Sequence, residues 1–135
     1  MNDLINQYIA LSEEVISQNN TMVTDNFNFI DSITRIKLNT YKNALPEYFK
    51  KLKELDEMYS SSFKATGAIN DLNYLNAQLS IVAHSREMAT SSLSNFETAI
   101  SNTEDSLKFR LTISLAITAI VISIISMAIS VASQA

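Results

Sequence analysis

The sequence predicts an all-α protein: a long antiparallel helical hairpin, coiled-coil-like, that continues into a single C-terminal transmembrane helix. Three observations lead to this prediction. The 135 residues include one glycine, one proline and no cysteine. Because tight hairpins and phosphate-binding loops need glycine, this composition argues against sheet folds and nucleotide-binding loops. Apolar residues recur at helical spacing along most of the chain, and all the charged residues lie within residues 1–110.

Residues 1–60 are predicted to form an amphipathic helical arm. Two neighbouring columns of apolar residues repeat every seven positions and predict a helix from about residue 3 to residue 42. These columns are Tyr8, Val15, Met22, Phe29 and Ile36, and Ile9, Ile16, Val23 and Ile30. Pro46 either starts a new helix or kinks a long one, so the arm should be kinked or broken near it.

An apolar face continues beyond the proline through Leu45, Tyr48 or Phe49, Leu52, Leu55 and Tyr59. The serine run of residues 60–62 is then the expected turn, with Gly67 as a hinge.

Residues 61–110 are predicted to form a heptad-patterned helix that packs against the first arm. Its apolar positions alternate spacings of three and four, and mostly Ser, Asn, Thr and Gln lie between them, so the helix needs a partner. The predicted hairpin core on this helix is Leu72, Leu75, Leu79, Val82, Leu93, Phe96, Ile100 and Leu107. Arg86 falls in the same stripe, where it either extends from the edge to water or forms a register-setting ion pair. His84 close by is expected to be a surface or packing residue.

Residues 111–133 form a predicted transmembrane helix. Residues 111–132 contain no charged residue, glycine or proline. A bilayer core of about 30 Å needs about 20 helical residues, so this length fits. The Ile, Leu and Val residues favour insertion, and the Ser and Thr hydroxyls can bond back to helix carbonyls. A buried helix of a soluble bundle fits less well, because such helices normally show a polar face.

Lys108 and Arg110 flank the beginning of this segment, and no lysine or arginine follows it. The positive-inside rule then predicts a tail-anchored, single-pass protein with residues 1–110 in the cytoplasm. These two side chains are the candidate topology or headgroup contacts. Secretion before insertion is the alternative.

Small residues form a stripe along the predicted span at heptad spacing. The small-residue stripe is Thr112, Ala116, Ala119, Ser123, Ser126, Ser130 and Ser133. In lipid, small residues let helices approach closely, and hydroxyls bond across the contact. The stripe begins about 140° around the helix from Leu107, which separates it from the hairpin face. The stripe therefore predicts contact between copies of the chain, either as simple helix packing or as the lining of a narrow pore. The alternative is that these small residues belong to a helix without a partner.

The sequence offers no support for catalysis. It contains no His-Glu-x-x-His or Gly-x-Ser-x-Gly motif, and neighbouring acidic residues point about 100° apart on a helix. We therefore expect no enzyme activity, cofactor, metal or small-molecule substrate. The net charge of −4 argues against nucleic acid as a partner. The lysines of residues 50–53 are either a solvated helix face or a patch for an acidic partner or anionic lipid.

These features predict a tail-anchored membrane protein that self-associates through its C-terminal helix. Its assembly would be membrane-permeabilising or pore-like, of the toxin, holin or effector type. One alternative is a membrane-anchored coiled-coil adaptor or tether without a pore. Another is a soluble helical pore-forming toxin component that inserts its C-terminal helix. The expected partners are a lipid bilayer, further copies of the chain and, for a tether, a helical protein.

Overall fold

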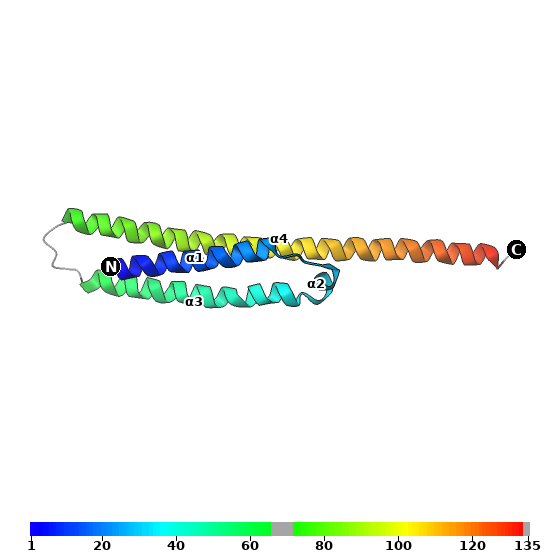
Figure 1. The fold of residues 1–135 in the computed structure, drawn as a ribbon, viewed down its shortest axis with the longest axis horizontal. Helices are drawn as coiled ribbons and strands as arrows, with labels where there is room; N and C mark the ends of the chain where they lie inside the picture. The colour runs from blue at the N-terminus through cyan, green and yellow to red at the C-terminus, as the bar shows by residue number, and fades with distance from the viewer. Residues whose placement is uncertain (66–71, 134–135) are drawn as a thin grey trace.

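The computed structural model describes residues 1–65 and 72–133, and this part of the chain consists of helices. They are α1 (Asn2–Thr24), α2 (Phe29–Thr34), α3 (Ile36–Ala65) and α4 (Leu72–Ala132). Figure 1 shows α1, α3 and the first half of α4 side by side, while the second half of α4 extends alone. At 1.5 Å per residue, the 61 residues of α4 reach about 90 Å. The all-α class and the long apolar C-terminal helix are confirmed.

The part of the chain that packs on α4 consists of two long antiparallel helices instead of one arm. Following the colours of Figure 1 from the N-terminus, α1 runs in the direction of α4 and α3 runs back against it. The bundle therefore has three long helices, and the predicted two-armed hairpin is wrong in this respect. The chain reverses between Thr24 and Ile36, inside the stretch that the apolar repeat predicts to be one helix.

Local capping explains the reversal. The Asn28 side chain accepts a hydrogen bond from the Asp31 backbone N–H at 3.0 Å, and the Asp31 carboxylate accepts from the Asn28 N–H at 2.9 Å. This capping box starts α2, and Arg35, left-handed at φ 53°, ends it. The seven-residue apolar repeat is therefore divided between two helices: Met22 of α1 is buried, whereas Phe29 of α2 is exposed.

Neither Pro46 nor the serine run of residues 60–62 ends a helix. Both lie inside α3, so the helix does not break at the proline and the predicted turn at the serines is wrong. The alternative of a kink in a long helix at Pro46 stays a prediction. An interior proline costs about 3 kcal/mol, and packing of the neighbouring Leu45 and buried Tyr48 against the bundle core offsets it. Serine disfavours a helix only mildly, and the Ser61 hydroxyl donates to the Met58 carbonyl. Gly67 lies outside the described residues.

The bundle core lies where the three long helices meet. Tyr8 and Val15 of α1 are fully buried, and Tyr48 of α3 meets Phe96 of α4 edge to face with ring centroids 6.3 Å apart. Tyr48, not Phe49, is therefore the core residue of that pair.

Of the predicted hairpin core on α4, the C-terminal part is the more deeply buried. Leu75 and Leu79 are half-buried, and the Leu72 side chain lies outside what the structure describes. The buried members are Val82, Leu93, Phe96, Ile100 and Leu107.

One polar cluster connects all three long helices. The Asp56 carboxylate of α3 accepts a hydrogen bond from the hydroxyl of buried Tyr8 and two from the Arg86 guanidinium, each at 2.7 Å. We call these three residues the Asp56 cluster. Arg86 thus forms an interhelical ion pair, and its hydrogen bonds hold the pKa of Asp56 below the usual 3.8. Burial, followed by the hydrogen bond to Asp56, raises the pKa of Tyr8 well above its usual range.

Replacing Asp56 with asparagine should destabilise the bundle. Arg86 is 46% exposed, so we expect a loss of about 1–2 kcal/mol in the free energy of unfolding. Because the folded pKa of Asp56 lies below 3.8, its contribution is complete above that pH and is lost as pH falls below it. D56N should therefore also lose less stability than the wild type between neutral and acidic pH.

Chemical denaturation of the full-length chain in detergent, followed by circular dichroism, measures both effects. Glu57→Gln is the matched control, because Glu57 is exposed and its carboxylate lies 3.8 Å from Lys53. Equal losses for D56N and E57Q would show that the Asp56 cluster contributes nothing particular.

Candidate membrane anchor

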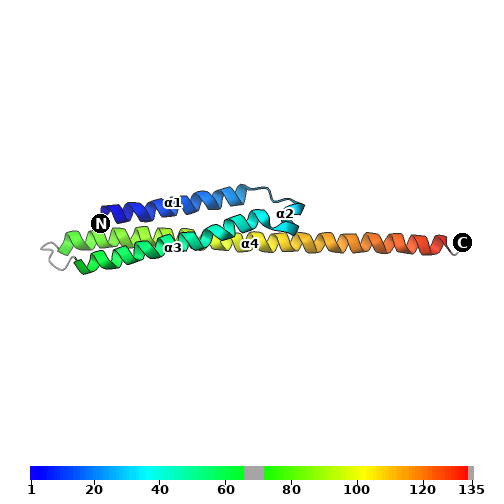
Figure 2. The same cartoon turned by 90° about the horizontal axis from the view of Figure 1, so that it is seen from below.

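The second half of α4 leaves the bundle and has no covering element. Every residue from 115 to 133 is exposed, and the most apolar 18-residue stretch is 0% buried. Figure 2 shows this half alone beyond the bundle. Among the described residues, α4 is the one helix long and apolar enough to cross a membrane. Residues 111–132 measure about 33 Å at 1.5 Å per residue, close to the hydrocarbon thickness of about 30 Å.

The bundle and this apolar segment are parts of one unbroken helix. Because α4 continues through Arg110, the angle between its bundle-facing side and the small-residue stripe follows from helix geometry. The bundle-facing series continues from buried Leu107 to half-buried Leu111 and Ser114 and then stops. Every member of the stripe is exposed, beginning about 140° away at Thr112.

Hydroxyl groups of the segment are bonded to the helix backbone. Thr112, Thr118 and Ser123 each donate to the carbonyl four residues earlier, at 3.0, 2.8 and 2.8 Å. Ser133 donates to the Ser130 carbonyl at 2.9 Å. In hydrocarbon an unpaired donor is costly, and these bonds satisfy the donors within the helix itself. These hydroxyls therefore do not require a polar partner for the helix to enter lipid.

Charged residues surround α4 just before the segment begins. Glu104 accepts from Lys42 at 2.7 Å, and its carboxylate also lies 3.3 Å from Lys108 and 3.4 Å from Arg35. We call these four residues the Glu104 cluster. The hydrogen bond from Lys42, followed by that from Lys108, holds the pKa of Glu104 below 4.5. The charge of Lys108 is thus compensated within the bundle.

Arg110 stands at the boundary itself. Its guanidinium donates to the Phe27 carbonyl at 3.0 Å, and no described carboxylate forms an ion pair with it. This hydrogen bond ties the loop between α1 and α2 to α4. Arg110 therefore keeps its positive charge next to the apolar segment.

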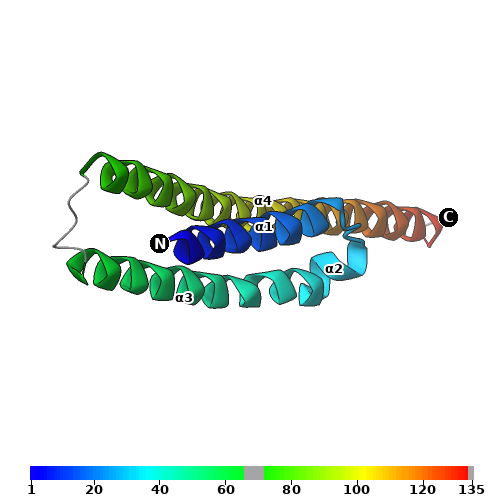
Figure 3. The same ribbon diagram turned by 60° about the vertical axis from the view of Figure 1, so that its left-hand side comes forward.

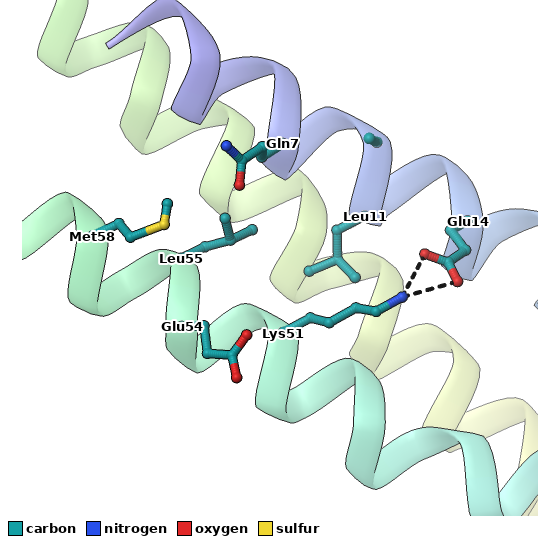
Figure 4. Close-up of a pocket in the computed structure, with 8 residues that line it drawn as sticks. Gln7, Leu11, Glu14, Lys51, Glu54, Leu55 and Met58 are labelled. Carbon is teal, nitrogen blue, oxygen red and sulfur yellow. Dashed lines mark hydrogen bonds and ion pairs between the residues drawn. The ribbon is translucent and has the colours of Figure 1, made fainter.

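The lysines of residues 50–53 face acidic groups of the bundle itself. In the shallow groove between α1 and α3, Lys51 reaches both Glu14 carboxylate oxygens, at 3.0 and 3.2 Å (Figure 4). Lys50 lies 3.8 Å from Glu54, and Lys53 makes the corresponding contact one turn on with Glu57. This arrangement is that of a solvated helix face. His84 is also exposed, 3.9 Å from Glu87.

The apolar residues around α2 are the main feature that sequence reasoning misplaced. Phe29, Ile30 and Ile36 were expected on the buried side of a long helix, but they are 53%, 66% and 69% exposed. The signal that could have placed them is the sequence Asp-Asn-Phe-Asn at residues 25–28, in which three of the four residues are turn-forming Asp or Asn and the last one caps α2.

No family model, curated protein sequence or solved structure matches the chain. Within the described residues, no group of three or more His, Asp or Glu side chains is placed to hold a metal ion. The exposed apolar half of α4 and the end of the bundle from which it emerges form the candidate functional site.

Proposed function

We propose that the protein is a single-span membrane protein in which residues 111–132 cross the bilayer. The observation that carries this proposal is the complete exposure of the apolar half of α4. A soluble monomer rarely exposes an apolar patch larger than a few hundred Å², and an uncovered helix of this length exceeds that. The seven Ile, two Leu and two Val of the segment together favour insertion by about 3–7 kcal/mol.

The bundle then lies on one side of the membrane, held by the continuous helix. We place it on the cytoplasmic side, because Lys108 and Arg110 lie directly before the span. Arg110 supports this orientation most directly, since no described carboxylate neutralises it. In this form the protein presents a three-helix surface at the membrane, as a tether or adaptor does.

Ending the chain after Ser114 should release the protein from membranes without unfolding the bundle. Every described residue beyond Ser114, from 115 to 133, is exposed, so this truncation takes away no described part of the bundle. Flotation with liposomes and resistance to alkaline extraction measure the release, and circular dichroism measures the fold.

The matched control is Ile120→Leu with Ile124→Leu, which keeps the segment apolar and should keep the protein in the membrane. A truncated chain that still floats with liposomes would contradict the anchor. A truncated chain that unfolds would show instead that the apolar helix belongs to the folded core.

A second candidate function, membrane permeabilisation by an assembly of copies, is supported by the position of the small-residue stripe. The stripe faces about 140° away from the bundle-facing side of α4, so spans can meet there without displacing α1 or α3. Close approach of small residues favours such contacts in lipid. Whether the assembled helices enclose water distinguishes a pore-forming effector from a packed anchor.

Ser123→Leu with Ser126→Leu should weaken self-association. Leucine prevents the close approach of helices that small residues allow, so we expect association to weaken severalfold, by about 1 kcal/mol. Crosslinking of the reconstituted chain measures the oligomer, and dye leakage from the same vesicles measures permeability.

The control Ile122→Leu with Ile125→Leu introduces leucine at two positions outside the stripe and should change neither readout. An unchanged oligomer in the serine variant would contradict the stripe as the interface. Tight vesicles that contain a wild-type oligomer would contradict the pore and leave the anchor.

A further inference from the structure

Helix α2 has its apolar residues outside and a serine inside. Ser32 is 1% exposed, whereas Phe29, Ile30 and Ile33 are 53%, 66% and 56% exposed. At 100° per residue these three side chains lie within an arc of about 100°, and Asp31 lies about 150° from the middle of that arc. We call Phe29, Ile30 and Ile33 the α2 apolar face. A six-residue helix with this arrangement exposes its apolar face to whatever lies beyond the bundle.

The α2 helix lies at the level where the apolar segment of α4 begins. The carbonyl of Phe27, two residues before α2 begins, accepts a hydrogen bond from Arg110. Leu111 and Ser114 are the last half-buried residues of α4. Helix α2 contacts α4 near the end of the bundle from which the apolar segment emerges (Figure 1). Ser114 lies about 6 Å beyond Arg110 along the helix axis. Figures 2 and 3 show α2 turned across the direction of α4.

We propose that α2 is an interfacial helix whose apolar face enters the boundary between headgroups and acyl chains of the bilayer that α4 crosses. This inference depends on the proposed membrane span. Interfacial helices lie in the membrane plane with their apolar side about 5–10 Å deep, and both the depth and the crosswise direction of α2 agree with that geometry. The chain would thus contact the membrane at two places, and the second contact would fix the rotation and tilt of the bundle.

Lipid suits the α2 apolar face better than a second copy of the chain does. Even at about 200 Å² per side chain, three partly exposed residues fall short of the about 800 Å² that a stable interface buries on each partner. A bilayer surface needs no such area, because α4 already holds the bundle against it. Opposite charges around α2 pair with one another, as Lys37 does with Asp25 at 2.9 Å. The contact is therefore apolar, and it should form on phosphatidylcholine without anionic lipid.

Fluorescent labels at single engineered cysteines test the depth of α2. The chain has no native cysteine, so each label reports one position. The full-length chain, labelled with an NBD probe at Ile30 or Ile33, is reconstituted into phosphatidylcholine vesicles. Ile120 in the apolar segment is the lipid reference. Ile81 is the water reference, because it is 54% exposed and lies about 45 Å before Leu111 along α4.

Labels at Ile30 and Ile33 should resemble the label at Ile120 in being out of water, but they should lie at a shallower depth than it. We expect a blue-shifted emission, quenching by lipids brominated near the headgroup end of the acyl chain, and protection from aqueous iodide. The label at Ile81 should show the reverse. Adding Ile30→Asp should shift the label at position 33 towards the behaviour of the water reference, whereas Ile81→Asp should leave that label unchanged.

Each other outcome overturns the inference in a distinguishable way. If iodide reaches positions 30 and 33 while position 120 stays in lipid, α2 stands clear of the membrane and the proposed span remains. If iodide also reaches position 120, the proposed span itself fails. A third outcome is that neither quencher reaches positions 30 and 33 at a high ratio of protein to lipid, but both labels become accessible when more lipid is added. In that case a second copy of the chain covers the α2 apolar face.

Discussion

The continuity of α4 through Arg110 is the constraint on which the rest of the structure depends. One rigid helix passes from a surface that α1 and α3 cover to a surface that nothing covers. Before Leu107 its apolar residues are spaced for a helical partner, and beyond Ser114 they surround the whole helix. The two halves therefore suit different surroundings, and the junction between them is where the chain places Arg110 and α2.

Two polar clusters determine the register of α1 and α3 along α4. The Asp56 cluster joins three helices far from the junction, and the Glu104 cluster joins α3 to α4 close to it. Arg86 and Glu104 are about 27 Å apart along α4, so pairing at both places disfavours sliding of α3 by one heptad, which the apolar repeat alone permits. Because each carboxylate remains partly in water, such pairing favours one register at modest gain in stability.

The sequence was sufficient for features that depend on long regular patterns. The α4 helix, its buried residues from Val82 to Leu107 and the apolar segment all follow from periodicity and length. The reversal at residues 25–35 was missed because three Asp or Asn residues among the four at 25–28 are weaker evidence than an apolar repeat that continues across them. The left-handed backbone of Arg35 had no signal either, since that conformation usually indicates glycine or asparagine.

The sequence alone also could not identify the partners of individual charged residues. Arg86 in an apolar stripe suggested an ion pair, but its partner Asp56 became identifiable only once α3 was known to run antiparallel to α4. The apolar residues of α2 show the opposite problem. Their spacing indicates a buried face, and only the fold places them at the surface beside the beginning of the apolar segment.

Hydrogen–deuterium exchange of the full-length chain in phosphatidylcholine vesicles tests the central claim most directly. A lone helix in water opens at little cost, so the backbone amides of residues 115–132 should exchange quickly unless lipid surrounds them. If α4 spans the membrane, these amides will exchange as slowly as those of the bundle core around Phe96, although no protein element covers them. Exchange of this segment within seconds, while the bundle core stays protected, would contradict a membrane-spanning α4.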